Sequence, residues 1–301
     1  MKRIILFLLT NLAAVLMLSC VAGVVSAFLG IDLSAELGDG GLVPLLIVSF
    51  LLGMTGSVIS LLMSKPMVKM SMHCSTVTGR EGEAERWLLA TVEDLAHRAN
   101  IRMPEVAIYP GEANAFATGA FKNSALIAVS TGIMRQMTRE ELRAVLGHEM
   151  SHVANGDMVT MSLTQGVINT FVIFFSHILA TIVQNALSGE KGNRRRGGGY
   201  FLYHMIVNLF QMLFGFLASL VVFWYSRKRE YAADAGSARL LGSPAPMIAA
   251  LRRLGNLKPG VLPDSIKAFG ISGKKTSLFA THPALEDRIE ALMNLPPSYA
   301  V

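Results

Sequence analysis

Residues 144–157 read "AVLGHEMSHVANGD" and place two histidines four positions apart, His148 and His152, with Glu149 directly after the first. Residues four apart lie on one face of a helix, so both imidazoles can present to one ion. The glutamate then turns toward the water that such an ion would bind. The stretch is typical of a metal site that activates water.

The residues around this motif predict the limits of its helix. Thr138 followed by Glu141 forms a capping-box pattern at the start, and the pair Asn155-Gly156 predicts the end. We expect the histidines in the last turns of this helix. Asp157 follows at once, and we expect its carboxylate to cap the next helix.

A catalytic zinc site needs a third protein ligand and an open position. In "SRKREYAADAGSARLL", residues 226–241, Glu230 and Asp234 again lie four apart on one helix face. We predict that Glu230 is the third ligand of one zinc ion per subunit. Asp234 would accept the second ring N–H of a ligand histidine, His148 above all; the alternative is a solvated acidic pair that balances "RKR". His177 and His204 are weaker rival ligands, because they lie in apolar segments.

Composition indicates a membrane protein. The chain has 301 residues, of which 52% are hydrophobic and 16% charged. Residues 4–29 and 42–63 contain no charge and are each long enough to cross a bilayer as a helix. Residues 158–187 and 200–226 make two further segments of that length. We therefore expect four helical membrane segments; a cleaved signal peptide is the alternative for 4–29, although its apolar run continues beyond Cys20.

Charges around the first two segments predict the orientation. Basic residues precede the first segment and follow the second, and the connecting loop is acidic: Lys2, Arg3, Lys65 and Lys69 against Asp32, Glu36 and Asp39. By the positive-inside rule both termini and the metal motif are cytoplasmic. Full crossing by the later pair places the Arg-rich loop 189–199 outside, against that rule, so a shallow or re-entrant hairpin is the alternative.

Two other classes of protein are disfavoured. Cys20 and Cys74 are the two cysteines of the chain, so neither a disulfide framework nor a cysteine zinc site is expected. The net charge of +6 comes largely from membrane flanks and the Arg-rich loop. No basic stripe interleaved with aromatic residues is present, which argues against nucleic-acid binding.

The remaining segments read as an α+β domain. Residues 81–101 have the apolar periodicity of a surface helix, and residues 105–110, 113–119 and 124–134 read as three strands of a small sheet. We expect four parts: a membrane hairpin, the first part of the catalytic domain, a second hairpin, and the second part of the domain. Their ranges are 1–64, 65–157, 158–226 and 227–301.

The order of motifs resembles the bacterial HtpX heat-shock membrane metalloproteases. The motifs are HExxH, "RKREYAAD", "NAFATG" and "THPALEDRI", and the likeness extends over essentially the whole chain. The wider group includes the eukaryotic CaaX prenyl proteases, which share the zinc site but have more membrane segments. The resemblance implies a zincin-like (gluzincin) zinc endopeptidase of the inner membrane. It would face the cytoplasm and act under stress in quality control of misfolded or damaged membrane proteins, alongside an ATP-dependent membrane protease.

The resemblance also implies roles for single residues. It makes His148, His152 and Glu230 zinc ligands, Glu149 the base and Asp234 their support. "NAFATG" would be an edge strand whose Asn114, Ala115 and Phe116 pair with an extended substrate; an ordinary strand is the alternative. "HPALEDR" would bring His282 or Arg288 to the oxyanion, the alternative being a helix start at Pro283 with Arg288 in a salt bridge.

Three hypotheses of function follow. In the leading one, Glu149 assists attack of zinc-bound water on a peptide bond in a cytoplasmic segment of a membrane protein. The second is a membrane zinc transporter or sensor, but transport favours ionisable residues along the spans, where His177 and His204 are the candidates. A scaffold without activity is the third, and the presence of every group needed for hydrolysis disfavours it.

Overall fold

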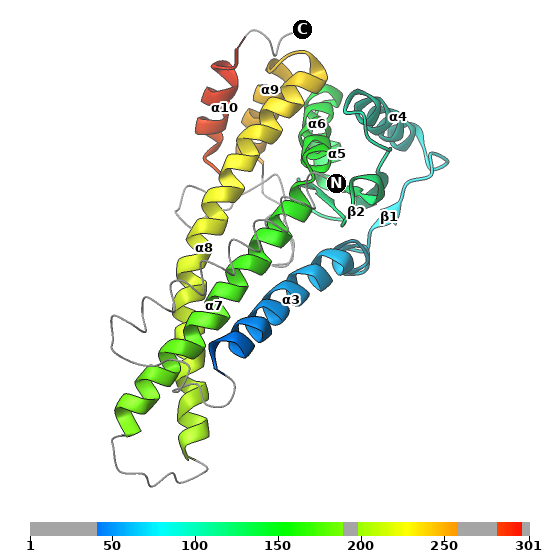
Figure 1. The fold of residues 1–301 in the computed structure, drawn as a ribbon. Coiled ribbons are helices and arrows are strands. Elements are labelled where there is room, and N and C mark those ends of the chain that lie inside the picture. Colours follow the sequence, from blue (N-terminus) through cyan, green and yellow to red (C-terminus); the bar gives the residue numbers. More distant parts are fainter. Residues whose placement is uncertain (1–40, 189–197, 258–281, 297–301) are drawn as a thin grey trace. The chain divides into compact units, whose positions relative to one another are not determined.

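The computed structural model describes residues 41–188, 198–257 and 282–296. The chain forms two compact units: residues 1–59 with 162–221, here the helical unit, and residues 60–161 with 222–301, here the sheet unit. The expected membrane segment 4–29 and most of its acidic loop lie outside the described residues. Figure 1 shows the elements along the chain.

The helical unit contains the apolar parts of three long helices. They are α3 (Leu42–Ser71), α7 (Asp157–Ser188) and α8 (Gly198–Leu241). Each is long and apolar enough to cross a membrane. The three expected segments that fall in the described residues are therefore confirmed as helices of spanning length. Both α7 and α8 are continuous helices.

Glycines set the packing of α3 on α7 within the helical unit. A Cβ atom on Gly53 would lie 2.6 Å from the main-chain nitrogen of Thr170, and one on Gly166 would lie 2.6 Å from Met54 Sδ. Small residues let membrane helices approach closely, which lipid-facing apolar residues alone do not achieve. Phe174 and Ile178 of α7 bury beside this crossing.

The sheet unit is built on four strands in the order β1-β2-β4-β3. They are β1 (Ser75–Thr76), β2 (Glu105–Tyr109), β3 (Ala115–Thr118) and β4 (Leu126–Ser130). β2 and β4 are parallel, whereas β1 on β2 and β3 on β4 are antiparallel. The three expected strands are present, and the two-residue β1 adds an edge that the sequence did not indicate.

One strand is shorter than the sequence predicts. The pattern of residues 124–134 predicts a single strand, but the structure ends β4 at Ser130 and forms a short helix, α5 (Thr131–Gln136). Ser130 Oγ accepts a hydrogen bond from the main-chain N–H of Ile133 at 3.1 Å. A serine in this position is a helix N-cap, which stops the strand.

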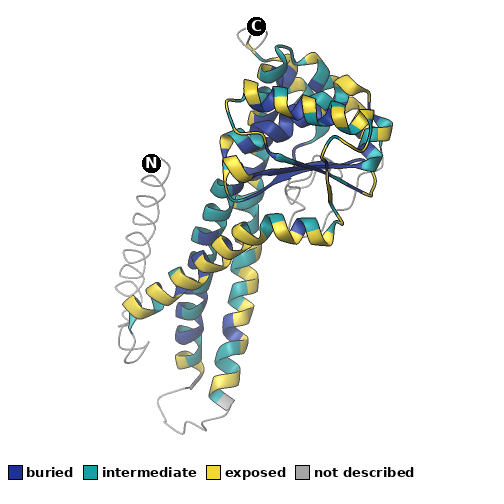
Figure 2. Cartoon of the chain, turned by 90° about the vertical axis from the view of Figure 1, so that its right-hand side faces the viewer, coloured by how far each residue is buried: buried dark blue, intermediate teal, exposed yellow. Residues whose placement is uncertain are grey.

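Helices cover both faces of the sheet. One face packs on α4 (Glu83–Arg98) and α6 (Arg139–Asn155), with α9 (Ala245–Gly255) and α10 (Leu285–Met293) completing the core. On the other face, Val68 from the end of α3 packs against Tyr109, Phe116 and Leu126. The central strands are consequently buried on both sides, as the dark blue arrows in Figure 2 show.

The motif helix α6 has the ends that the sequence predicts. Thr138 and Glu141 form a reciprocal capping box, and Gly156 closes the helix in the left-handed conformation, with φ of 65°. Because Gly156 turns the chain sharply, α7 begins at the next residue, Asp157. This tight α6–α7 junction places the first residue of α7 beside the histidines.

Candidate metal centre

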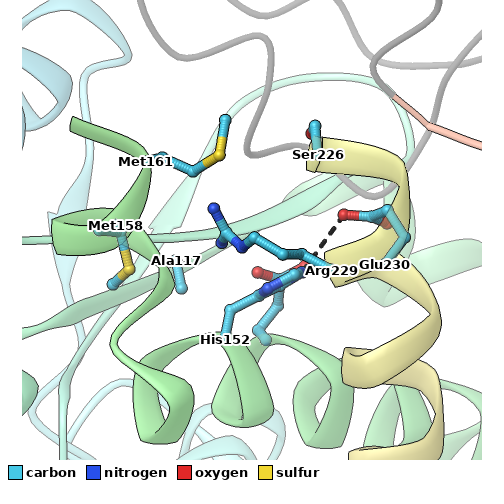
Figure 3. Close-up of a pocket in the computed structure, with 8 residues that line it drawn as sticks. Ala117, His152, Met158, Met161, Ser226, Arg229 and Glu230 are labelled. Atoms are coloured by element: carbon cyan, nitrogen blue, oxygen red, sulfur yellow. Dashed lines mark ion pairs between the residues drawn. The ribbon is translucent and has the colours of Figure 1, made fainter. Parts of the chain in front are cut away.

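The two motif histidines and Glu230 converge in the sheet unit. His148 Nε2 and His152 Nε2 lie 3.2 Å apart. Glu230 of α8 approaches them with Oε2 3.5 Å from His148 Nε2 and Oε1 3.4 Å from His152 Nε2, the second pair being the dashed line in Figure 3. Within the described residues, these three form a group whose ligand atoms all lie within 4.8 Å of one another.

Small residues bring α6 and α8 close enough for this convergence. A Cβ atom on Gly147 would lie 2.8 Å from Ser237 Oγ, and one on Gly236 would lie 2.5 Å from Ser151 Oγ. Ser237 Oγ also donates to the main-chain carbonyl of Ala144 at 2.7 Å. The helices thus meet almost backbone to backbone, one residue from His148 and His152.

An aspartate carboxylate contacts the Nδ1 atom of each histidine. Asp234 Oδ1 lies 2.8 Å from His148 Nδ1, and Asp157 Oδ2 lies 2.7 Å from His152 Nδ1. A carboxylate at Nδ1 fixes the ring and leaves Nε2 as the ligand atom. Asp157 therefore contacts His152 with the carboxylate that we expected to cap α7.

Each aspartate is in turn paired with an arginine. Arg288 donates from Nε and Nη2 to both oxygens of Asp234, at 2.8 and 2.7 Å, and it is fully buried. Arg229 Nη2 lies 3.1 Å from Asp157 Oδ2. Two arms result, His148–Asp234–Arg288 and His152–Asp157–Arg229.

This donor set fits a divalent cation. The Nδ1 atoms of both histidines contact carboxylates, and their Nε2 atoms lie 3.2 Å apart. The two Nε2 atoms must therefore either share protons with Glu230 or bind the same ion. Burial lowers the pKa of His152, but its hydrogen bonds to Asp157 and Glu230 outweigh burial and raise the pKa to about 10. The surrounding carboxylates thus favour positive charge at the imidazoles, and they favour a cation between them for the same reason.

Glu149 lies beside this group without belonging to it. Its side chain is buried, and burial raises its pKa to about 7 although the neighbouring histidines lower it. It lines a pocket whose other residues come from β3, α6, α7 and α8; Figure 3 labels these other residues. The lining residues are Ala117, Glu149, His152, Met158, Met161, Ser226, Arg229 and Glu230.

Of the residues expected to hold a substrate strand, Ala115 and Phe116 lie on β3, the last strand in the sheet order, and Asn114 directly precedes it. Ser130 N donates to the Asn114 carbonyl at 2.9 Å, so alternate pairing directs the main-chain groups of Ala115 and Ala117 away from β4. Asn114 Oδ1 accepts from Ala115 N at 2.9 Å. The Phe116 side chain contacts Tyr109 on the face of the sheet that Val68 covers, opposite the face that packs on α4 and α6.

Of the two oxyanion candidates, His282 approaches the cluster from the side of Glu230. Its Nδ1 lies 2.9 Å from Glu230 Oε2. Arg288 is committed to Asp234, and its Nη1 lies 3.5 Å from Glu230 Oε2. The salt bridge that is the alternative role for Arg288 is therefore present, with Asp234 as its partner, but the helix begins at Leu285 and not at Pro283.

The rival histidines are not part of the metal group. His177 lies on α7 in the helical unit, and its Nδ1 forms a hydrogen bond of 2.8 Å with Tyr203 Oη. The ring of His204 contacts Tyr203 and Tyr200. The His177–Tyr203 hydrogen bond joins α7 to α8, the His204 contacts lie within α8, and none of these interactions brings a carboxylate to either histidine.

Sequence reasoning missed Asp157 and Arg229 as members of the site. The signal for Asp157 was present, because a helix that ends at a left-handed glycine returns the following residue toward its last turn. Arg229 stood in "RKR", which reads as a membrane flank. The sequence does not indicate that Arg229 pairs with Asp157, because only the folded chain brings the two residues together.

Known proteins are similar to this chain in sequence. A model for peptidase family M48 matches residues 83–295. A protein called "Protease HtpX homolog" from Bordetella pertussis is 52% identical over 298 residues, 98% of this chain and 99% of its own. Another of the same name from Acidovorax ebreus is 49% identical over 295 residues, 98% of this chain and 99% of its own.

A solved structure has a related fold. The crystal structure of S. mikatae Ste24p aligns with a TM-score of 0.56 at 21% identity and covers 95% of this chain and 66% of its own. The likeness at this identity concerns the fold, whereas the relatives above share about half of their residues with nearly the entire chain. The chain therefore belongs to peptidase family M48, as a multi-pass membrane metallopeptidase related to HtpX.

Proposed function

We propose that this metallopeptidase is a zinc endopeptidase with His148, His152 and Glu230 as its ligands, one ion per subunit. Two imidazoles and one carboxylate with a position left open are the usual donor set of catalytic zinc. The observation that carries the proposal is the pair of Nε2 atoms 3.2 Å apart with Glu230 facing both. Zinc in this place supplies Lewis acidity toward a peptide carbonyl and toward water.

Glu149 is the general base in this proposal. It lines the same pocket as His152 and Glu230. Its carboxylate takes a proton from the attacking water and returns it to the leaving amine. Asp234 and Arg288 act behind His148: they hold the imidazole in one tautomer and one orientation.

A substrate binds as an extended strand along β3 in this proposal. The outward main-chain groups of Ala117 and the outward carbonyl of Ala115 supply hydrogen bonds that do not depend on substrate sequence. Asn114 supports this edge through its side-chain bond to Ala115 N. Phe116 anchors the strand in the sheet. His282, rather than Arg288, is the candidate for the oxyanion, because Arg288 is already paired with both oxygens of Asp234.

The cellular setting is proposed from the relatives and the charge pattern. We place the protein in the inner membrane. Lys65 and Lys69 follow the apolar part of α3, which supports a sheet unit on the cytoplasmic side, together with both termini. A role in quality control of misfolded membrane proteins, together with an ATP-dependent membrane protease, is the part of this proposal that rests on the resemblance to HtpX metalloproteases alone. The four-part domain organisation belongs to the same proposal.

Two variants test the assignment. Glu149→Gln should retain zinc and lose cleavage of an unfolded membrane protein, because it removes the base and no ligand. Glu230→Ala should lose both zinc and cleavage. Metal content and cleavage are measured on the same purified samples. Cleavage by Glu149→Gln at the wild-type rate would show that the base is elsewhere.

A further inference from the structure

Arg229 and Arg288 each keep a guanidinium nitrogen without a hydrogen-bond acceptor among the described residues, but they differ in position. Arg288 is fully buried, gives Nε and Nη2 to Asp234, and has its remaining Nη1 3.5 Å from Glu230 Oε2. Arg229 approaches Asp157 with Nη2 alone, and its Nε is buried with no hydrogen-bond acceptor among the described residues. A buried donor without an acceptor costs stability unless a ligand supplies one.

This donor belongs to a side chain in the wall of the pocket. The Arg229 side chain is 12% exposed and lines the pocket together with Glu149 and Glu230. Figure 3 shows it extending from α8 toward Met158 and Met161 at the start of α7. Arg288 does not line this pocket. Of the two arginines, Arg229 alone can therefore reach a molecule bound there.

The charges around Arg229 select the chemical class of that molecule. Asp157 already balances the guanidinium, and two further carboxylates, Glu149 and Glu230, line the same pocket. Another carboxylate would be repelled, whereas a neutral acceptor meets no such cost. The two methionines add an apolar surface. A peptide carbonyl is the neutral acceptor that every protein segment carries.

We propose that Arg229 is a substrate-binding residue that donates a hydrogen bond to a main-chain carbonyl of the bound peptide. The inference rests on the proposed function, since it concerns the same pocket. Ala117 of β3 also lines this pocket, so β3 and the Arg229 side chain of α8 would both hold the peptide through the main chain of the peptide. Binding of this kind tolerates any side chain, which suits an enzyme for misfolded proteins.

Peptide binding tests the proposal without relying on cleavage. The probe is a fluorescein-labelled ten-residue peptide of alanine, leucine and glutamine with blocked ends, and its affinity for the full-length, zinc-loaded Glu149→Gln protein is measured by anisotropy. Adding Arg229→Met should weaken binding about tenfold, the usual effect of losing a hydrogen bond to a charged group. Arg229→Lys should fall between the two, because it keeps the charge and loses the planar fork.

Lys228→Met is the matched control. It removes one positive charge from the neighbouring position, where Lys228 is exposed and stacks on Trp224 at 4.2 Å. Its peptide affinity should stay within about twofold of the parent, because it touches no pocket residue. Equal weakening by Lys228→Met would assign the effect to net charge and overturn the proposal.

Asp157→Asn separates substrate binding from support of His152. If Arg229 acts only by holding Asp157, then Asp157→Asn, Arg229→Met and the double variant lose zinc and peptide affinity to the same extent. The proposal expects Arg229→Met to weaken peptide binding further in the Asp157→Asn background. Unchanged peptide affinity in Arg229→Met would also overturn it. Absence of cleavage by the wild type, with the Arg229 effect intact, would count against the proposed function alone.

Discussion

Gly236→Ala tests whether backbone contact between α6 and α8 sets the metal geometry. The added Cβ atom would lie 2.5 Å from Ser151 Oγ and 2.7 Å from Ser151 Cβ. Carbon atoms in contact prefer a separation of about 3.5–4.0 Å, so the two helices must part by about 1 Å. Overpacking of this kind costs about 1–3 kcal/mol of folding free energy.

The movement should also reach the metal group. Glu230 lies on α8 and both histidines lie on α6, so a change of about 1 Å in the helix spacing far exceeds the ligand-distance tolerance of about 0.2 Å. We expect Gly236→Ala to weaken zinc binding at least tenfold, as changes in the residues that support metal ligands commonly do. Zinc affinity is measured by competition with a chelator, and stability by thermal unfolding.

Two further variants make the test specific. Gly215→Ala lies on the same helix with nothing within 4 Å of its Cβ position, so it should only add helix propensity, up to about 1 kcal/mol. Ser151→Gly, combined with Gly236→Ala, removes the atoms that clash and should restore zinc affinity toward the wild-type value. Wild-type zinc affinity in Gly236→Ala alone would refute the role of this contact.

Three more predictions concern the site and its surroundings. Asp234→Asn should lower zinc affinity about 10–100-fold in chelator competition, because the support of His148 is weakened. Arg288→Met should cost about 3–5 kcal/mol in unfolding experiments, because it leaves the buried Asp234 without its cation. Burial opposes the effect of Lys69, Lys65 and Thr76 on Glu105, but their hydrogen bonds prevail and lower its pKa to about 2. Since a lowered pKa stabilises the fold above the unfolded value of 4.5, Glu105→Gln should lower the unfolding temperature at pH 7, with a difference that shrinks as the pH falls from 4.5 toward 2.

Local signals in the sequence predicted the parts of the site that depend on one helix. The capping box at Thr138 and the glycine at 156 locate α6, and spacing alone puts His148 and His152 on one face. The role of Ser130 was missed, because a serine after a β-branched run reads equally as strand or as helix cap. The sequence also could not predict that Arg288 is buried. An arginine is almost never fully buried unless it is paired, and its pairing with Asp234 is visible only in the fold.

The metal centre is assembled from pieces that the membrane segments separate along the chain. His152 and Asp157 lie before the apolar part of α7, whereas Arg229, Glu230 and Asp234 follow the apolar part of α8. Both ends nevertheless belong to the same sheet unit. The Asp157–Arg229 pair and the contacts of Glu230 with both histidines therefore form only after the intervening α7–α8 segment has brought its ends together. In the proposed site, Glu230 therefore reaches the two histidines only in a chain whose α7–α8 segment has folded back on itself.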